Sequence, residues 1–122
     1  MSDFSDEPSS PGRIAPRYQF EARVAIQFRD GDRMAITEGW ARDLSESGLG
    51  AFVARGLSVG EQVTLVIPLT GSVRLVVPAQ VIACVGTRYG FRFTALSAEQ
   101  RTQIQSALRQ EPRIPYPAAP GS

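Results

Sequence analysis

The sequence predicts an all-β fold, a small antiparallel barrel or sandwich, with one α-helix at the C-terminal end of the folded unit. Three observations favour this class. Apolar residues alternate with polar ones along several short segments, which is the periodicity of half-buried strands. Turn-forming residues separate these segments at short intervals. The last segment before a proline-rich end changes to helical spacing.

The first expected strand covers residues 22–28. Its apolar residues Val24, Ile26 and Phe28 lie two apart, so they share one face of a strand. The sequence RDGDR follows and predicts a turn, because Gly31 can take a positive φ without steric cost. This pattern therefore indicates the first arm of a β-hairpin.

Five further strands are expected, in chain order, over 34–42, 48–54, 63–69, 73–85 and 89–96. The loop DLSESG separates the first two of these, and short polar turns separate the others. Pro78 cannot donate a ladder hydrogen bond, so it predicts an edge position or a bulge within its strand. Cys84 is the only cysteine, and its apolar surroundings predict a core residue in a reducing compartment.

A helix is expected over 97–110, because the periodicity changes after the last strand. Ser97 and Gln100 have the spacing of a capping box, which satisfies the first free N–H groups of a helix. Three apolar residues then fall on one helical face: Ile104, Ala107 and Leu108. We therefore expect one amphipathic helix packed on the sheet.

The chain has 122 residues, 43% of them hydrophobic, which is enough for one domain with a core. The two ends differ from the middle. Residues 1–12 are acidic and rich in Ser and Pro, and residues 112–122 are rich in Pro. Such segments bury little apolar surface, so we expect two disordered tails around a folded unit over 13–111.

The charge and composition exclude several classes of function. There are 13 basic residues, all of them Arg, against 12 acidic ones, so the net charge is +1 and gives no basic excess for DNA or RNA. Without His and Lys, the chain lacks the usual side chains of catalytic triads, zinc sites and P-loops. No enzyme activity and no metal are expected. With no membrane-spanning apolar run, we expect a soluble, cytoplasmic protein.

Two groups of residues remain as candidates for binding. In RIAPR, Arg13 and Arg17 lie four apart before the first strand, and Pro16 disfavours a helix there. In a bent or extended segment, both guanidinium groups can contact one ligand from two sides. The alternative is a pair of solvated arginines.

The second group lies in DLSESG. Asp43 can accept two hydrogen bonds side by side, which matches the N1–H and N2–H₂ donors of guanine. Ser45 lies two residues on and would point the same way in an extended backbone. Gly48 permits a tight turn or close approach of a ligand. The alternative is an ordinary hairpin turn.

The order Arg-x-x-x-Arg, strand, turn, strand, Asp-x-Ser-x-x-Gly, further strands and a closing helix resembles the PilZ domain family. The resemblance covers about residues 13–110. It implies a six-stranded antiparallel barrel of Greek-key type with one C-terminal helix, and binding of the bacterial second messenger cyclic di-GMP. It also implies a ligand-binding leader over 13–20, a barrel over 22–96 and a helix over 97–110.

The resemblance assigns the site residues one by one. Arg13 and Arg17 would grip phosphates and the Hoogsteen edges of guanine, and the leader would become ordered on binding. Asp43 and Ser45 would meet a guanine from the barrel, and Gly48 would shape the loop beneath it. Gly12 stands where many relatives carry a further arginine.

Four other residues could add stacking or phosphate contacts, although the pattern does not place them in the site: Trp40, Arg42, Arg88 and Tyr89. The favoured hypothesis is a single-domain cyclic di-GMP receptor that acts on an effector protein, without DNA, RNA or membrane insertion. The first alternative is a PilZ-like interaction module without ligand. The second is a small nucleic-acid-binding barrel, which the near-neutral charge disfavours.

Overall fold

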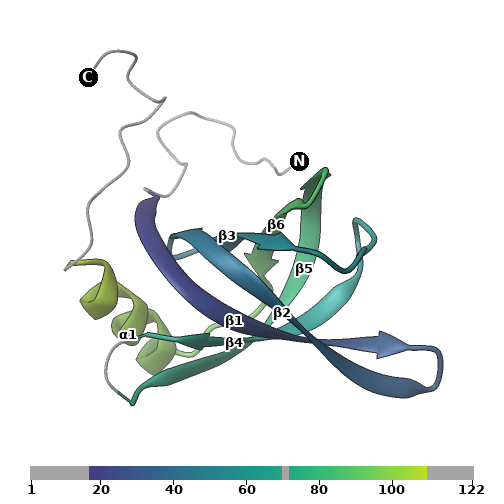
Figure 1. The fold of residues 1–122 in the computed structure, drawn as a ribbon. Coiled ribbons are helices and arrows are strands. Elements are labelled where there is room, and N and C mark those ends of the chain that lie inside the picture. The colour runs from purple at the N-terminus through teal and green to yellow at the C-terminus, as the bar shows by residue number, and fades with distance from the viewer. Residues whose placement is uncertain (1–16, 70–71, 110–122) are drawn as a thin grey trace, which may run out of the picture.

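A computed structural model describes residues 17–69 and 72–109 (Figure 1). In this part of the chain, six strands form a closed barrel and one helix lies beside it. The elements are β1 (Tyr18–Asp30), β2 (Arg33–Leu44), β3 (Gly48–Val53), β4 (Gln62–Pro68), β5 (Arg74–Val85), β6 (Arg88–Phe93) and α1 (Ala98–Leu108). This confirms the predicted all-β class and the single C-terminal helix.

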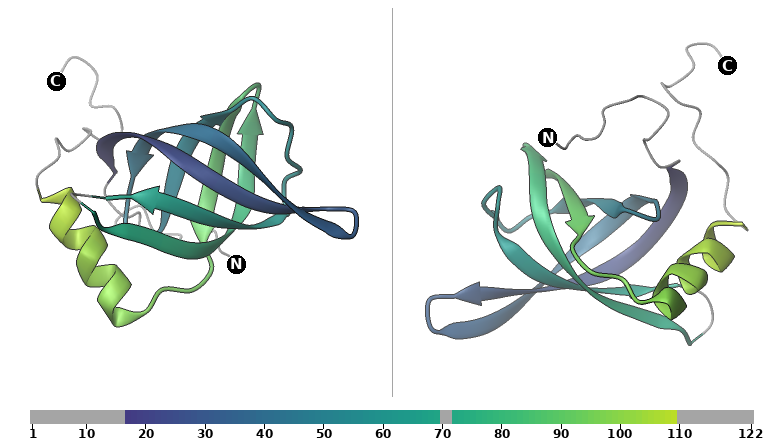
Figure 2. Two further views of the ribbon diagram at one scale, coloured as in Figure 1. Left: turned by 60° about the horizontal axis from the view of Figure 1, so that its bottom comes forward. Right: turned by 180° about the vertical axis from the view of Figure 1, so that it is seen from behind.

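The strands follow the order β1-β2-β3-β6-β5-β4, and β4 pairs with β1 to close the barrel. Every pairing is antiparallel. Strands β4, β5 and β6 pair in succession, and β3 lies beside β6, which is the Greek-key arrangement. The barrel form is therefore confirmed over the sandwich. Figure 2 shows the helix beside one end of the barrel.

The core follows the alternation in the sequence. Val24, Ile26 and Phe28 point into the barrel and are 1%, 0% and 3% exposed. The predicted face of α1 is buried against the same core. Its capping box is present, because the Ser97 side chain accepts from the Gln100 N–H and the Gln100 side chain accepts from the Ser97 N–H. In the described ranges, no helix is long and apolar enough to cross a membrane.

The β1–β2 hairpin begins earlier than predicted. Gly31 takes φ 65° in its turn, as expected, but the ladder extends back to Tyr18, four residues before the predicted start at residue 22. Phe20 is only 5% exposed and belongs to the core. The end of the predicted leader is thus part of the barrel, while Arg13 lies outside the described residues.

The prediction that Cys84 lies in the core is wrong, because its side chain is exposed. The prediction depended on the apolar surroundings of Cys84. Cys84 lies beyond the β5–β6 register shift between Val81 and Ala83, in a stretch of β5, residues 82–85, whose side chains are all exposed. Beyond this shift, β5 pairs with β6 alone. Pro78 precedes the bulge, and its carbonyl accepts a hydrogen bond from the Thr94 N–H. Thr94 lies just past the end of β6. On that side of β5, the N–H that proline lacks is therefore not needed for the β5–β6 ladder.

Candidate functional site

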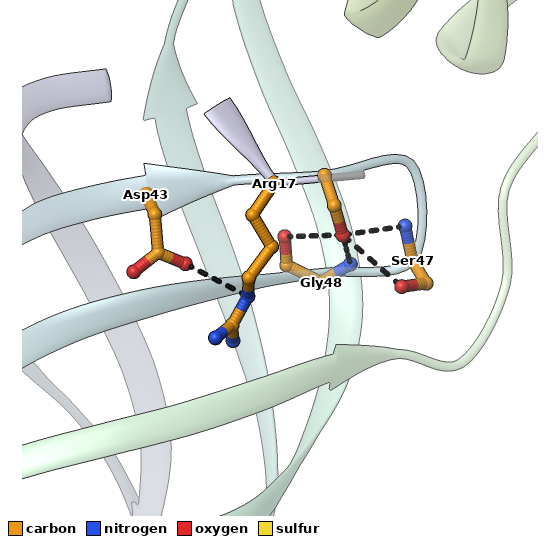
Figure 3. A network of polar contacts seen from close by, with 5 residues as sticks. Arg17, Asp43, Ser47 and Gly48 are labelled. Carbon is orange, nitrogen blue, oxygen red and sulfur yellow. Dashed lines mark hydrogen bonds and ion pairs between the residues drawn. The ribbon is translucent and has the colours of Figure 1, made fainter. Parts of the chain in front are cut away.

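The loop between β2 and β3 is organised by the hydroxyl of Ser45. Its Oγ accepts hydrogen bonds from the backbone N–H groups of Ser47, at 3.1 Å, and Gly48, at 3.2 Å. The Ser47 Oγ also lies within hydrogen-bond distance, at 3.1 Å, and Figure 3 draws these contacts as dashed lines. Ser45 is only 5% exposed. The Ser45 hydroxyl therefore contacts its own loop in this structure. A direct contact between Ser45 and a ligand stays a prediction.

Replacing Ser45 by alanine is expected to lower the melting temperature, because two backbone N–H groups lose their acceptor. Each such loss costs about 1–3 kcal/mol when the group is buried. Ser47→Ala is the matched control, since Ser47 is exposed and loses only one hydroxyl contact. Thermal unfolding of both variants measures the difference. Equal melting temperatures for the two variants would show that the loop does not depend on Ser45.

Gly48 is required by the pairing of β3 with β6. A Cβ atom at this position would collide with the carbonyl oxygen of Phe91. Gly48 pairs with Arg92 at the start of the β3–β6 ladder, so a larger residue would push the two strands apart. The glycine of the DLSESG loop thus has a packing role in the barrel.

Asp43 lies at the end of β2, beside a register shift between Ala41 and Asp43. It pairs with Gly50 of β3, and a Cβ on Gly50 would lie 2.7 and 2.8 Å from the two carboxylate oxygens. Only glycine leaves room for the carboxylate to occupy this position. The Asp43 side chain is largely buried, with 14% of its surface exposed.

Arg17 extends from the segment before β1 to the same place. Its Nε lies 3.4 Å from Asp43 Oδ1, the contact drawn as a dashed line in Figure 3. The Arg17 side chain is 51% exposed. The structure therefore brings together one residue from each of the two predicted groups. The predicted site includes three more residues: Ser45 and Gly48 lie in the adjoining loop, and Arg13 falls outside the described range.

A pocket of about 270 Å³ lies next to the Arg17–Asp43 pair. Its lining includes Gly50 of β3 and Gly90 of β6, which pair directly across the strands. Arg42, Arg88 and Tyr89 also line it. The sequence had left these last three outside the site, because their position depends on how distant strands pair.

The pocket lining is positively charged, since it holds three arginines and one carboxylate. Arg42 is held in place by Glu21, 3.7 Å away, and its guanidinium lies 5.3 Å from the centre of the Phe52 ring. Trp40 lies elsewhere, in an open depression of about 480 Å³ beside Arg23 and Glu38. The guanidinium groups of arginines bind phosphates through paired hydrogen bonds, and a carboxylate can accept hydrogen bonds from the donors on a nucleobase edge. The pocket therefore suits an anionic nucleotide.

The family model of the PilZ domain matches residues 12–110, a range that includes every described residue. The chain belongs to the PilZ domain family. PilZ domains are receptor or adaptor modules. No curated protein matches the sequence.

Solved PilZ structures share the fold of this domain. The PilZ domain of CeSA from a cellulose-synthesizing bacterium is 23% identical, with a TM-score of 0.60 over 76% of this chain and 94% of that one. The PilZ domain of YcgR from Escherichia coli, solved with cyclic di-GMP, is 20% identical, with a TM-score of 0.62 over 80% and 88%. MotI (DgrA), an inhibitor of motility from Bacillus subtilis, is 19% identical, with a TM-score of 0.61, and this PilZ domain matches only 50% of its length.

Proposed function

We propose that this PilZ domain is a cytoplasmic receptor for cyclic di-GMP that passes its signal to an effector protein. One observation carries the proposal. Arg17 and Asp43, which come from the two separate parts of the PilZ sequence pattern, meet at one pocket on the barrel. The structure of the YcgR PilZ domain with cyclic di-GMP supports the choice of ligand.

The chemistry of the pocket fits the two parts of this ligand. The carboxylate of Asp43 accepts from N1–H and N2–H₂ of one guanine, while arginine forks bind phosphate oxygens and the O6/N7 pair of guanine. Arg13 and Arg17 supply these forks from the segment before β1. Binding orders this segment over the pocket, which is a common form of signalling switch.

Isothermal titration tests the proposal. Cyclic di-GMP is expected to bind with micromolar or better affinity, which corresponds to about −8 kcal/mol. Cyclic di-AMP is expected to bind at least about tenfold more weakly. The N1 atom of adenine is a hydrogen-bond acceptor, whereas the N1–H of guanine is a donor to the Asp43 carboxylate. No binding heat at protein concentrations of roughly tens of micromolar would refute the proposal. Equal affinity for both dinucleotides would refute the assignment of Asp43.

A second candidate function is a protein-interaction module that needs no ligand. Met34 and Ile36 on β2 favour it, since these apolar side chains are 62% and 66% exposed on one face of the strand. A pull-down with and without cyclic di-GMP separates the two functions. A partner that binds only with cyclic di-GMP supports the receptor function. Identical partners in both samples, together with a titration that gives no binding heat, support the interaction module without ligand.

A further inference from the structure

We propose that β6 supplies a second half of the ligand site, in which Gly90 leaves a bare floor for one base and Arg88 contacts a phosphate. This inference rests on the proposed function and deepens it. It concerns residues outside the two PilZ sequence motifs described above, since the second motif ends at Gly48. The base is one guanine of cyclic di-GMP, and the phosphate belongs to the same ligand.

The floor follows from the strand register. Four positions lie side by side across the sheet: Asp43 on β2, Gly50 on β3, Gly90 on β6 and Ala83 on β5. The two central positions carry no side chain. Since neighbouring strands lie about 4.8 Å apart, the backbone positions of Asp43 and Ala83 lie about 14 Å apart, and the Asp43 carboxylate extends over Gly50. The uncovered backbone is therefore at Gly90, where a flat base can lie with its edge toward the carboxylate.

The next outward-facing positions form a wall along the strip. Phe52 of β3 pairs with Arg88 of β6, and both residues line the pocket. Arg17 and Arg42 each lie near a carboxylate, at 3.4 and 3.7 Å. Arg88 has no ion-pair partner among residues 17–69 and 72–109. Its guanidinium is thus available, within the described structure, for the negative charge of a bound phosphate.

Neither a positive φ nor a steric clash requires a glycine at position 90. The positive-φ glycines of the described structure are Gly31, Gly60 and Gly86, so Gly90 is not among them. A Cβ at Gly90 would lie 3.4 Å from the Ala83 Cβ, which is an ordinary contact. Glycine inside a strand is less stable than alanine. A strand glycine marks a bulge or the close approach of a ligand. The β5 bulge between Val81 and Ala83 lies opposite Gly90, and the position of Gly90 in the middle of a pocket favours ligand approach as well.

Two graded variants test the floor. Gly90→Ala and Gly90→Val add one and three carbons to it, and the valine is expected to weaken cyclic di-GMP binding at least about tenfold. The alanine variant is expected to weaken it less. Gly56→Ala is the control, because a Cβ there meets nothing within 4 Å and Gly56 lies outside the pocket. Thermal unfolding shows whether each variant keeps the wild-type fold.

Arg88→Ala tests the phosphate contact without changing the floor. Loss of charge-assisted hydrogen bonds is expected to weaken binding about ten- to a hundredfold. Arg92→Ala is the control on the same strand, since Arg92 contacts Gln80 and does not line the pocket. Because Arg88 is exposed, this variant is informative even where Gly90→Val fails to fold.

The outcomes distinguish the two proposals. If the wild-type domain does not bind cyclic di-GMP, the proposed function fails. If the wild type binds and both Arg88→Ala and a folded Gly90→Val bind equally well, the β6 half-site is refuted while the receptor function stands. Weaker binding by both variants, with unchanged binding by Gly56→Ala and Arg92→Ala, is the result that we expect.

Discussion

Replacing Arg17 by alanine is expected to weaken cyclic di-GMP binding about ten- to a hundredfold and to leave the melting temperature nearly unchanged. The affinity falls because Arg17 supplies charge-assisted hydrogen bonds, each contributing about 1.5–3 kcal/mol. The stability changes little because the Arg17 side chain is half exposed, and such ion pairs contribute at most about 1 kcal/mol. We expect the same loss for Arg13→Ala. Titration and thermal unfolding measure the two effects.

The chain offers a matched control for this prediction. Arg23 forms an ion pair with Glu38 at 3.8 Å, and both side chains are exposed and lie outside the pocket beside Asp43. Arg23→Ala should therefore keep its affinity within a few-fold of the wild type. If Arg23→Ala weakens binding as much as Arg17→Ala, the placement of the ligand is wrong. If Arg17→Ala unfolds the ligand-free domain, Arg17 has a structural role.

Replacing Asp43 by alanine is expected to remove most of the preference for guanine. The carboxylate is the pocket's only acidic group among the described lining residues, so its loss leaves the guanine N1–H and N2–H₂ donors without their charged acceptor. Cyclic di-GMP should bind about a hundredfold more weakly, while cyclic di-AMP changes little. The ratio of the two affinities, measured by titration, should fall toward one.

Two further variants sharpen this prediction. Asp43→Asn keeps the shape of the side chain but presents amide donors or a neutral acceptor, so it should lose selectivity as well. Glu38→Gln removes a carboxylate from the same strand outside the pocket, and its selectivity should equal that of the wild type. Retained selectivity in Asp43→Ala would mean that another group reads the base.

The Arg17–Asp43 contact involves one of the carboxylate oxygens that the proposed ligand would use. Arg17 Nε lies 3.4 Å from Oδ1, one of the two oxygens that guanine is expected to use. Each carboxylate oxygen has two lone pairs, so Oδ1 can accept from guanine while Arg17 stays beside it. Because the Arg17 side chain is half exposed, it can also turn toward a phosphate without a rearrangement of the barrel.

Local patterns in the sequence predicted most of the barrel. The alternation of Val24, Ile26 and Phe28 identified a face that is buried, and the Ser97–Gln100 spacing identified the start of α1. The exceptions have non-local causes. Cys84 is exposed because the end of β5 pairs with β6 alone, and which strands flank a segment cannot be read from the sequence of that segment.

The site was predicted only in part, for the same reason. The sequence singled out Arg17 and Asp43, and the structure places them together. The sequence does not indicate Gly50 or Gly90, and it names Arg88 without placing it in the site, because the relation of these residues to Asp43 depends on pairing among β2, β3 and β6. Glycine in a strand is a weak signal by itself, because bulges, tight packing and ligand approach all use it.

Backbone amide NMR during titration with cyclic di-GMP tests the central claim, that this pocket holds the ligand. If the ligand lies in this pocket, the amide signals of Gly50 and Gly90 will move with the added ligand and saturate. Those of Gly56 and Gly60, which lie outside the pocket, should stay in place. No movement at all, or the largest movements along α1 with Gly50 and Gly90 unchanged, would show that the ligand does not lie in this pocket.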